Sequence, residues 1–252
     1  MRRLKVNPNL KDLSVKIFAD GAELSVMKKM AENPLIKGFT TNPTLMRKAA
    51  VTDYEAFADL VVSEFSTYPI SLEVFADELP VMEQQARKLS FLGENVYVKI
   101  PITNTKGVST APIIQRLSYD GIKINITAIM LLSQVREIVS VLQEDVSSYI
   151  SVFAGRVADT GCDPIPLMQE SLKILQEKPL AELLWASPRE LLNVIQADQI
   201  GCHIITATKD ILEKLKLIGK NLNEYSLDTV KMFHQDAYAA RYHIALVDSI
   251  AV

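Results

Sequence analysis

The chain has 252 residues, of which 48% are hydrophobic and 23% charged, and its formal net charge at pH 7 is −3. This balance lacks the basic excess of nucleic-acid-binding domains, so we expect no nucleic-acid partner. No apolar run approaches the roughly 20 residues of a membrane span, and the first residues, MRRLKVNPNLKDL, lack the apolar core of a secretory signal. The two cysteines stand in no metal-ligand spacing and are too few for a disulfide framework, so we expect a cytoplasmic protein. Because no membrane span is predicted, we also expect no membrane partner.

Short runs rich in β-branched and aromatic residues recur along the chain and alternate with segments of helical periodicity. The predicted strands are residues 15–20, 36–42, 70–75, 96–101, 123–129, 149–156, 182–187 and 203–208. Helical periodicity is clearest over residues 19–33, 80–93 and 131–145.

Strands that alternate with helices over about 250 residues predict an α/β fold, a single (β/α)8 or TIM barrel. We expect one domain over residues 1–252, with a helical C-terminal segment from about residue 210. The competing fold is a doubly wound open sheet. That fold usually carries a Gly-rich turn after its first strand, and the chain has no GxGxxG or Walker A motif.

Polar side chains gather at the carboxyl ends of the predicted strands, whose first halves are mostly apolar. They are Asp20, Thr41, Asn42, Glu73, Lys99, Asn125, Thr127 and Ser151, with Arg156 just beyond its strand. Barrel enzymes build their sites at this face from the ends of several strands. The pattern therefore predicts one site at the C-terminal mouth of the barrel.

The fourth predicted strand, VYVKIP, places Lys99 among apolar residues. An ammonium group is costly to desolvate unless it is paired or gives up its proton. The simpler alternative is that Lys99 lies at a strand end and reaches water with its ammonium group. Desolvation favours the neutral amine of a lysine, and a neutral amine can attack a ketone. The resulting Schiff base is an electron sink for breaking the adjacent carbon–carbon bond.

Such a cycle needs groups that move protons and hold a water molecule, and Asp20, Glu73 and Thr127 are of the right types. Two alternatives stay open here. Asp20 could cap the following helix, and Glu73 could form a salt bridge with Lys99.

Metal catalysis is poorly supported, because none of the three histidines stands among the polar strand ends. A cation held by Asp20 and Glu73 would have Lys99 as a repelling neighbour. The lack of a suitable histidine also argues against a Ser/His/Asp triad. We therefore expect no metal.

An anion site is predicted where the sixth and seventh strands end. Arg156 closes SVFAGR, and in WASPREL we expect Ser187 to cap a helix that begins at Pro188, beside Arg189. Free N–H groups at a helix start late in the barrel order are a recurrent phosphate site, and arginine strengthens it. Each arginine alone could instead form a surface salt bridge.

The motifs FAD, GFTTNPT, LEV, VYVKIP, GIKINIT, ISVFAGR and WASPR follow one another over roughly residues 15–210. In this order and spacing the chain resembles the transaldolase family. The resemblance implies a (β/α)8 barrel with a Schiff-base lysine on its fourth strand and neither a metal nor an organic cofactor. It also implies sugar-phosphate substrates, between which a dihydroxyacetone unit is transferred.

The resemblance implies a role for each matching residue. Lys99 would form the Schiff base, Asp20 would be the acid/base, and Glu73 and Thr127 would hold the catalytic water. Substrate-binding roles fall to a further set: Asn42 and Asn125 for hydroxyl groups, Arg156, Ser187 and Arg189 for the phosphate, and Thr41, Ser151 and Phe153 as further contacts.

Two other functions stay open. Fructose-6-phosphate aldolases belong to the same family but carry Gln at the position of Glu73 and Tyr at that of Phe153, and a phenol can move protons where a phenyl ring cannot. Both positions here show the transaldolase choice. A non-catalytic sugar-phosphate-binding barrel would not need Lys99 and Asp20 together.

Two further features depart from the family pattern or lie outside it. Trp185 stands where the family usually has a small residue, and it could either fill the core or select the substrate. Apolar residues in YAARYHIALV, residues 238–247, indicate self-association, so we expect a homo-oligomer, although this segment could instead pack on the barrel.

Overall fold

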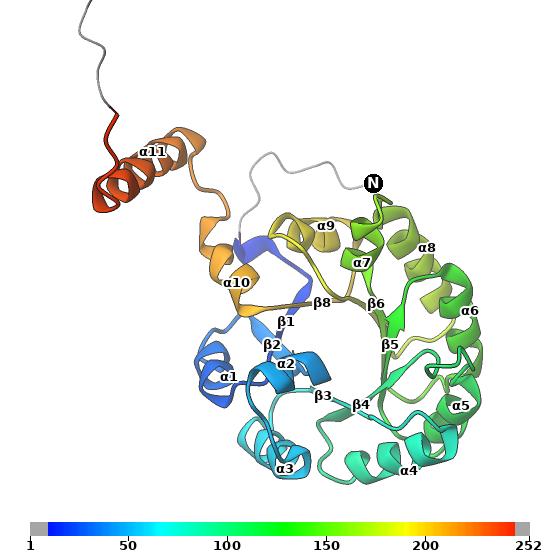
Figure 1. The fold of residues 1–252 in the computed structure, drawn as a ribbon. Helices are drawn as coiled ribbons and strands as arrows, with labels where there is room; N and C mark the ends of the chain where they lie inside the picture. Colours follow the sequence, from blue (N-terminus) through cyan, green and yellow to red (C-terminus); the bar gives the residue numbers. More distant parts are fainter. Residues whose placement is uncertain (1–9, 245–252) are drawn as a thin grey trace, which may run out of the picture.

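The computed structural model of the protein describes residues 10–244. Eight parallel strands form a closed barrel in chain order, with β1 paired to β8, which confirms the predicted fold (Figure 1). The strands are β1 (Lys16–Asp20), β2 (Ile36–Thr40), β3 (Ile70–Glu73), β4 (Val96–Pro101), β5 (Ile124–Ile129), β6 (Ser148–Val152), β7 (Ala181–Trp185) and β8 (Ile204–Ala207). The largest difference from the prediction is at β6, which ends at Val152, because the chain enters a helix two residues later.

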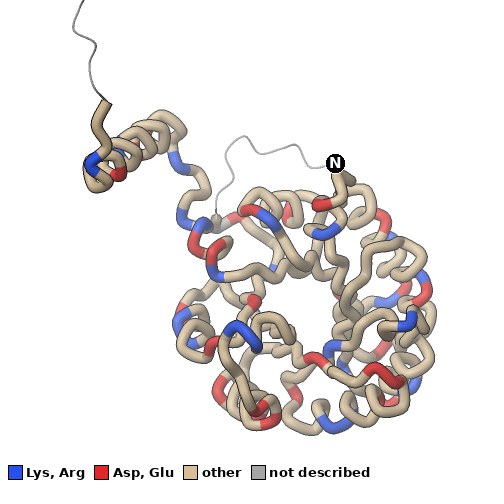
Figure 2. The backbone as a smooth tube through the Cα atoms, in the orientation of Figure 1, with Lys and Arg blue, Asp and Glu red and all other residues tan. Residues whose placement is uncertain are grey.

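Helices surround the barrel as an outer ring (Figure 1). The helices of the ring are α1 (Leu24–Ala31), α2 (Pro43–Lys48), α3 (Tyr54–Glu64), α4 (Leu79–Ser90), α5 (Ala111–Tyr119), α6 (Leu132–Val141), α7 (Ala154–Asp159), α8 (Ile165–Leu175), α9 (Leu192–Ile200) and α10 (Lys209–Leu212), with 3-10 turns at Leu10–Asp12 and Glu213–Leu217. A further helix, α11 (Leu222–Ala239), follows them in the chain. Asn42 and Asp53 begin α2 and α3 by accepting backbone N–H bonds with their side chains, as helix caps do. Charged residues of both signs are spread over the outer ring (Figure 2).

Aromatic and aliphatic side chains fill the inside of the barrel below the mouth. The rings of Tyr97 and Tyr149 stack with centroids 3.9 Å apart, and Phe18 meets Tyr149 edge-on at 5.7 Å. A Cβ at Gly38 would come within 2.6 Å of the Phe18 ring, so glycine makes room for that ring. Because side chains alternate along a strand, residues two positions later point inward above this layer. Phe18 and Tyr97 therefore lie beneath the polar residues that end their strands.

The C-terminal helix α11 stands away from the barrel (Figure 1). None of its residues is buried, and Leu227, Val230 and Phe233 are 53%, 60% and 63% exposed. Residues 245–247 of the segment that indicated self-association lie outside the described residues. Over residues 10–244 the chain forms no helix of the length and apolarity that a membrane crossing requires.

Candidate active site

A cavity of about 550 Å³ opens at the carboxyl ends of the strands. All but one of the residues that the sequence pointed to line it, namely Asp20, Asn42, Glu73, Lys99, Asn125, Thr127, Ser151, Phe153, Arg156, Ser187 and Arg189. The exception is Thr41, which is fully buried and whose hydroxyl donates to the carbonyl oxygen of Ser71 at 2.9 Å. Thr41 contributes to the site through its backbone, and the geometry gives no support to a direct substrate contact.

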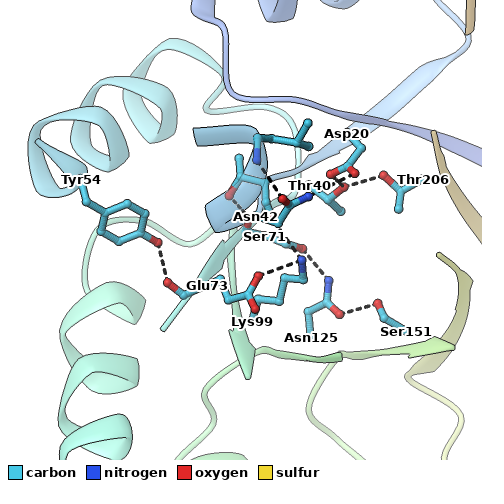
Figure 3. Close-up of polar contacts among 12 residues, drawn as sticks. Asp20, Thr40, Asn42, Tyr54, Ser71, Glu73, Lys99, Asn125, Ser151 and Thr206 are labelled. Atoms are coloured by element: carbon cyan, nitrogen blue, oxygen red, sulfur yellow. Dashed lines mark hydrogen bonds and ion pairs between the residues drawn. The ribbon is translucent and has the colours of Figure 1, made fainter. Parts of the chain in front are cut away.

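Lys99 lines this cavity and is only 7% exposed. Its Nζ is 3.0 Å from Oε2 of Glu73, its register neighbour on β3 (Figure 3). Nζ also donates to the carbonyl oxygen of Thr41 at 3.0 Å. The salt bridge considered for Glu73 is therefore present, and the ammonium group is paired inside the mouth instead of reaching the outer surface. Glu73 also lines the cavity, so its carboxylate can contact a ligand there while it is paired with Lys99.

Asp20 faces the same cavity from β1. One carboxylate oxygen accepts from Thr40 Oγ1 at 2.8 Å, and the other accepts from Asn42 Nδ2 at 3.4 Å (Figure 3). The helix-cap alternative does not hold, because α1 begins at Leu24 with Glu23 in the capping position. Burial raises the pKa of Asp20, and Glu73 adds to this, while Lys99 and the two hydrogen bonds oppose it. A carboxyl group with a raised pKa can take up and release a proton closer to neutral pH.

The β5 side of the cavity contains one fixed side chain and one unpaired hydroxyl. The Asn125 amide is held in one orientation, since its oxygen accepts from Ser151 Oγ at 2.6 Å and its nitrogen donates to Ser71 Oγ at 2.8 Å (Figure 3). Thr127 Oγ1 is buried without a hydrogen-bond partner among the described residues. A buried hydroxyl without a partner is unfavourable, so Thr127 is suited to bind a ligand or a water molecule.

The predicted anion site differs from its prediction in two ways. The helix expected at Pro188 is wrong, because α9 begins at Leu192. The N–H groups of Arg189 and Glu190 instead donate to Oδ1 of Asn193, at 2.8 and 3.2 Å, and Ser187 has a left-handed φ of 60°. These backbone groups are therefore already paired.

Two guanidinium groups and a hydroxyl remain at this end of the cavity. Arg156 lies in α7 and not at a strand end, with its guanidinium 5.8 Å from the centre of the Phe153 ring. Arg189 forms a two-point salt bridge with Asp159, in which Nε donates to Oδ1 at 2.8 Å and Nη2 to Oδ2. Arg156 and Ser187 together with Arg189 can bind an anion, although Asp159 already offsets part of the charge of Arg189.

Gly155 fixes the position of the loop that carries this anion site. A Cβ at Gly155 would lie 1.6 Å from the carbonyl oxygen of Ser187 and 2.7 Å from its carbonyl carbon. Only glycine therefore allows α7 to pack this closely against the loop after β7.

Sequence reasoning missed several contributors to the site. Thr40, Ser71 and Thr206 lie in the polar network at the mouth (Figure 3). The available signal for Ser71 was its position two residues before Glu73, which places both on one face of β3. For Thr40 it was the polar run of Thr40, Thr41 and Asn42 where β2 ends.

Two further questions from the sequence concern the role of Trp185 and the presence of a metal-ligand set. Trp185 is fully buried in the layer between barrel and helices and is not among the residues that line the cavity, which supports core filling. Within residues 10–244, no three His, Cys, Asp or Glu side chains gather as a metal-ligand set.

Comparisons with known proteins show which family the chain resembles. A family model described as "Transaldolase/Fructose-6-phosphate aldolase" matches residues 17–245. A "Probable transaldolase" of Methanococcus maripaludis is 34% identical over 202 residues, which are 80% of this chain and 89% of that protein. A "Probable transaldolase 2" of Listeria monocytogenes is 33% identical and covers 80% and 88%. Among solved structures, 3-hexulose-6-phosphate synthase from Salmonella typhimurium has a TM-score of 0.54 at 14% identity, covering 79% of this chain and 91% of that one, a likeness of fold alone.

Proposed function

This chain belongs to the transaldolase/fructose-6-phosphate aldolase family, and we propose that it transfers a dihydroxyacetone unit between sugar phosphates through a Schiff base on Lys99. The observation that carries the proposal is a buried lysine paired with a carboxylate inside a cavity that a second carboxyl group, Asp20, also lines. A barrel that only bound sugar phosphates would gain nothing from this combination.

The first half of the reaction breaks a carbon–carbon bond. Glu73, 3.0 Å from Nζ, is placed to accept the ammonium proton of Lys99, after which the neutral amine attacks the ketone carbon of the donor. Loss of water then gives an iminium ion. Asp20 takes the proton from the donor's C4 hydroxyl, the bond between C3 and C4 breaks, and its electron pair forms an enamine on Lys99 while the aldose leaves.

The second half reverses these steps with another aldose. The enamine attacks the acceptor's aldehyde carbon, and Asp20 returns its proton to the oxygen that becomes the new hydroxyl. A water molecule held by Glu73 and Thr127 then hydrolyses the iminium ion and frees Lys99. The buried Thr127 hydroxyl, which has no hydrogen-bond partner within residues 10–244, supports this role.

Substrate binding follows from the rest of the cavity wall. Asn42 and Asn125 would bind sugar hydroxyl groups, with Ser151 and Phe153 as further contacts. The phosphate would lie against Arg156, Ser187 and Arg189, whose two guanidinium groups and hydroxyl supply several donors.

A fructose-6-phosphate aldolase is the second candidate, because the same family and the same lysine would serve it. Incubation with fructose 6-phosphate, with and without erythrose 4-phosphate, separates the two functions. Ketose consumption that requires the acceptor supports the transaldolase. Release of free dihydroxyacetone without an acceptor would favour the aldolase, and binding without any turnover would favour the non-catalytic barrel. Lys99→Arg is the control and should be inactive in both mixtures.

We also propose that the protein is a cytoplasmic homo-oligomer in which α11 packs against a second copy. Large apolar residues along α11 are exposed, including Leu227, Val230 and Phe233. Light scattering after size exclusion should give a multiple of the 28.1 kDa chain, and Phe233→Asp should lower the mass toward one chain. A monomer at micromolar concentration would contradict the proposal.

A further inference from the structure

Two threonine hydroxyl groups connect Asp20 to the last strand of the barrel. Thr40 Oγ1 donates to Asp20 Oδ1 at 2.8 Å, and Thr206 Oγ1 lies 2.5 Å from Thr40 Oγ1 (Figure 3). Asp20 is in β1, Thr40 in β2 and Thr206 in β8, and β1 lies between the other two strands. Both threonines are buried, at 2% and 6% exposure, and both line the cavity. The catalytic steps proposed above use neither of them directly.

The direction of these hydrogen bonds depends on whether Asp20 carries a proton. An ionised carboxylate can only accept, so the single Thr40 proton points to Asp20, and Thr206 must donate to Thr40. A protonated Asp20 can donate to Thr40, which then donates to Thr206. Every hydroxyl therefore keeps a partner in both states without any movement of the heavy atoms.

We propose that Thr206 is a positioning residue, which acts through Thr40 to hold the Asp20 carboxyl group in one orientation through both of its protonation states. This inference rests on the proposed function, in which Asp20 first takes a proton and then returns it. A carboxyl group that stays fixed while its proton comes and goes remains aligned with the donor hydroxyl and with the acceptor oxygen.

Removal of the Thr206 hydroxyl should destabilise the ionised form of Asp20 more than the protonated form. Hydrogen bonds in a chain strengthen one another, and those to charged groups are the stronger ones. Burial already raises the pKa of Asp20, with a contribution from Glu73, and Lys99 opposes it from β4. The other charged groups that line the cavity are Arg156, Arg189 and Asp210, and a change at Thr206 leaves all of these in place. We therefore expect Thr206→Val to raise the pKa of Asp20 further.

The direct test is titration of the Asp20 carboxyl group by carbon-13 NMR in the full chain without substrate, with its signal assigned by its loss in Asp20→Asn. The titration midpoint should move to higher pH in Thr206→Val and stay close to that of the parent protein in Thr206→Ser, which keeps the hydroxyl. An unchanged or lower midpoint in Thr206→Val would overturn the proposal. Thr40→Val removes the middle of the connection and should raise the midpoint at least as much, so it serves as a second variant should Thr206→Val fail to fold.

Turnover supplies the second readout. In Thr206→Val the acidic limb of the kcat profile should move to higher pH, with kcat lowered about fivefold at the pH of that limb, the size expected for one hydrogen bond. Thr110→Val is the matched control: Thr110 is fully buried and donates to the Pro101 carbonyl oxygen at 2.7 Å, so its loss should lower stability and leave the limb in place. Because the NMR titration needs no activity, an inactive parent protein would contradict the proposed function while the Asp20 midpoints still decide the role of Thr206.

Discussion

Replacing Gly155 by alanine should displace the loop that carries the proposed phosphate site. The added Cβ would lie 1.6 Å from the Ser187 carbonyl oxygen, about half of a normal contact distance, and a backbone oxygen cannot rotate away as a side chain can. Overpacking of this kind costs about 1–3 kcal/mol. Alanine is more favourable than glycine in a helix by about 0.5–1 kcal/mol, so the free energy of unfolding should fall by about 1 kcal/mol.

The functional consequence of Gly155→Ala should be specific to phosphorylated donors. A shift of the loop moves Ser187 and Arg189 away from Arg156, and loss of one hydrogen bond to a charged group raises KM by about tenfold. The assays are urea unfolding and steady-state kinetics with fructose 6-phosphate and with unphosphorylated fructose. Gly21→Ala is the stability control, because a Cβ at Gly21 meets nothing within 4 Å. Parental stability together with a parental KM for fructose 6-phosphate in Gly155→Ala would refute the reasoning.

Three further predictions follow from single residues of the site. Burial raises the pKa of Asp20 above its ordinary value of 3.8. The stability that the protonated carboxyl group contributes is therefore fully present below pH 3.8 and is lost as the pH rises through the folded-state pKa. Urea unfolding at several pH values should therefore show Asp20→Asn becoming more stable relative to the parent across that window, and a constant difference would count against a raised pKa. Ala128 has a left-handed φ of 62°, so Ala128→Gly should raise the free energy of unfolding by about 0.5 kcal/mol, where a decrease would argue against strain there. Asp159→Asn should raise KM for fructose 6-phosphate about threefold with kcat unchanged, because Arg189 loses its two-point support, and an unchanged KM would separate Asp159 from the phosphate site.

The strands and the central residues of the site were predictable because both can be recognised from short stretches of sequence. Runs such as VYVKIP are bounded by turn residues, and parallel strands in a barrel place their carboxyl ends together, so Lys99 and Asp20 had to share one mouth. The loop after β7 depends instead on contacts between distant residues. Pro188 indicated a helix start, but in the structure the Ser187 backbone packs against Gly155, where a larger residue would clash. The Asn193 side chain accepts hydrogen bonds from the N–H groups that were expected to be free at the start of the helix.

Side-chain partners were the other feature that the pattern left undecided. Thr41 was predicted as a substrate contact, yet its carbonyl oxygen accepts from Lys99 and its hydroxyl donates to Ser71. Thr206 appeared only as one polar residue in an apolar strand, because its partner Thr40 lies 166 residues away along the chain. Hydrogen bonds across the barrel are set by strand register, which the sequence of a single strand does not specify.

The central claim is that Lys99 forms a Schiff base with the donor ketose. Borohydride reduction of the protein in the presence of fructose 6-phosphate, followed by peptide mass spectrometry, tests it directly, since reduction converts the iminium ion into a stable secondary amine. The account predicts an adduct on Lys99 in the parent protein and none in Lys99→Arg. The absence of an adduct on Lys99 with every ketose phosphate tried, or an adduct on another lysine that persists in Lys99→Arg, would contradict it.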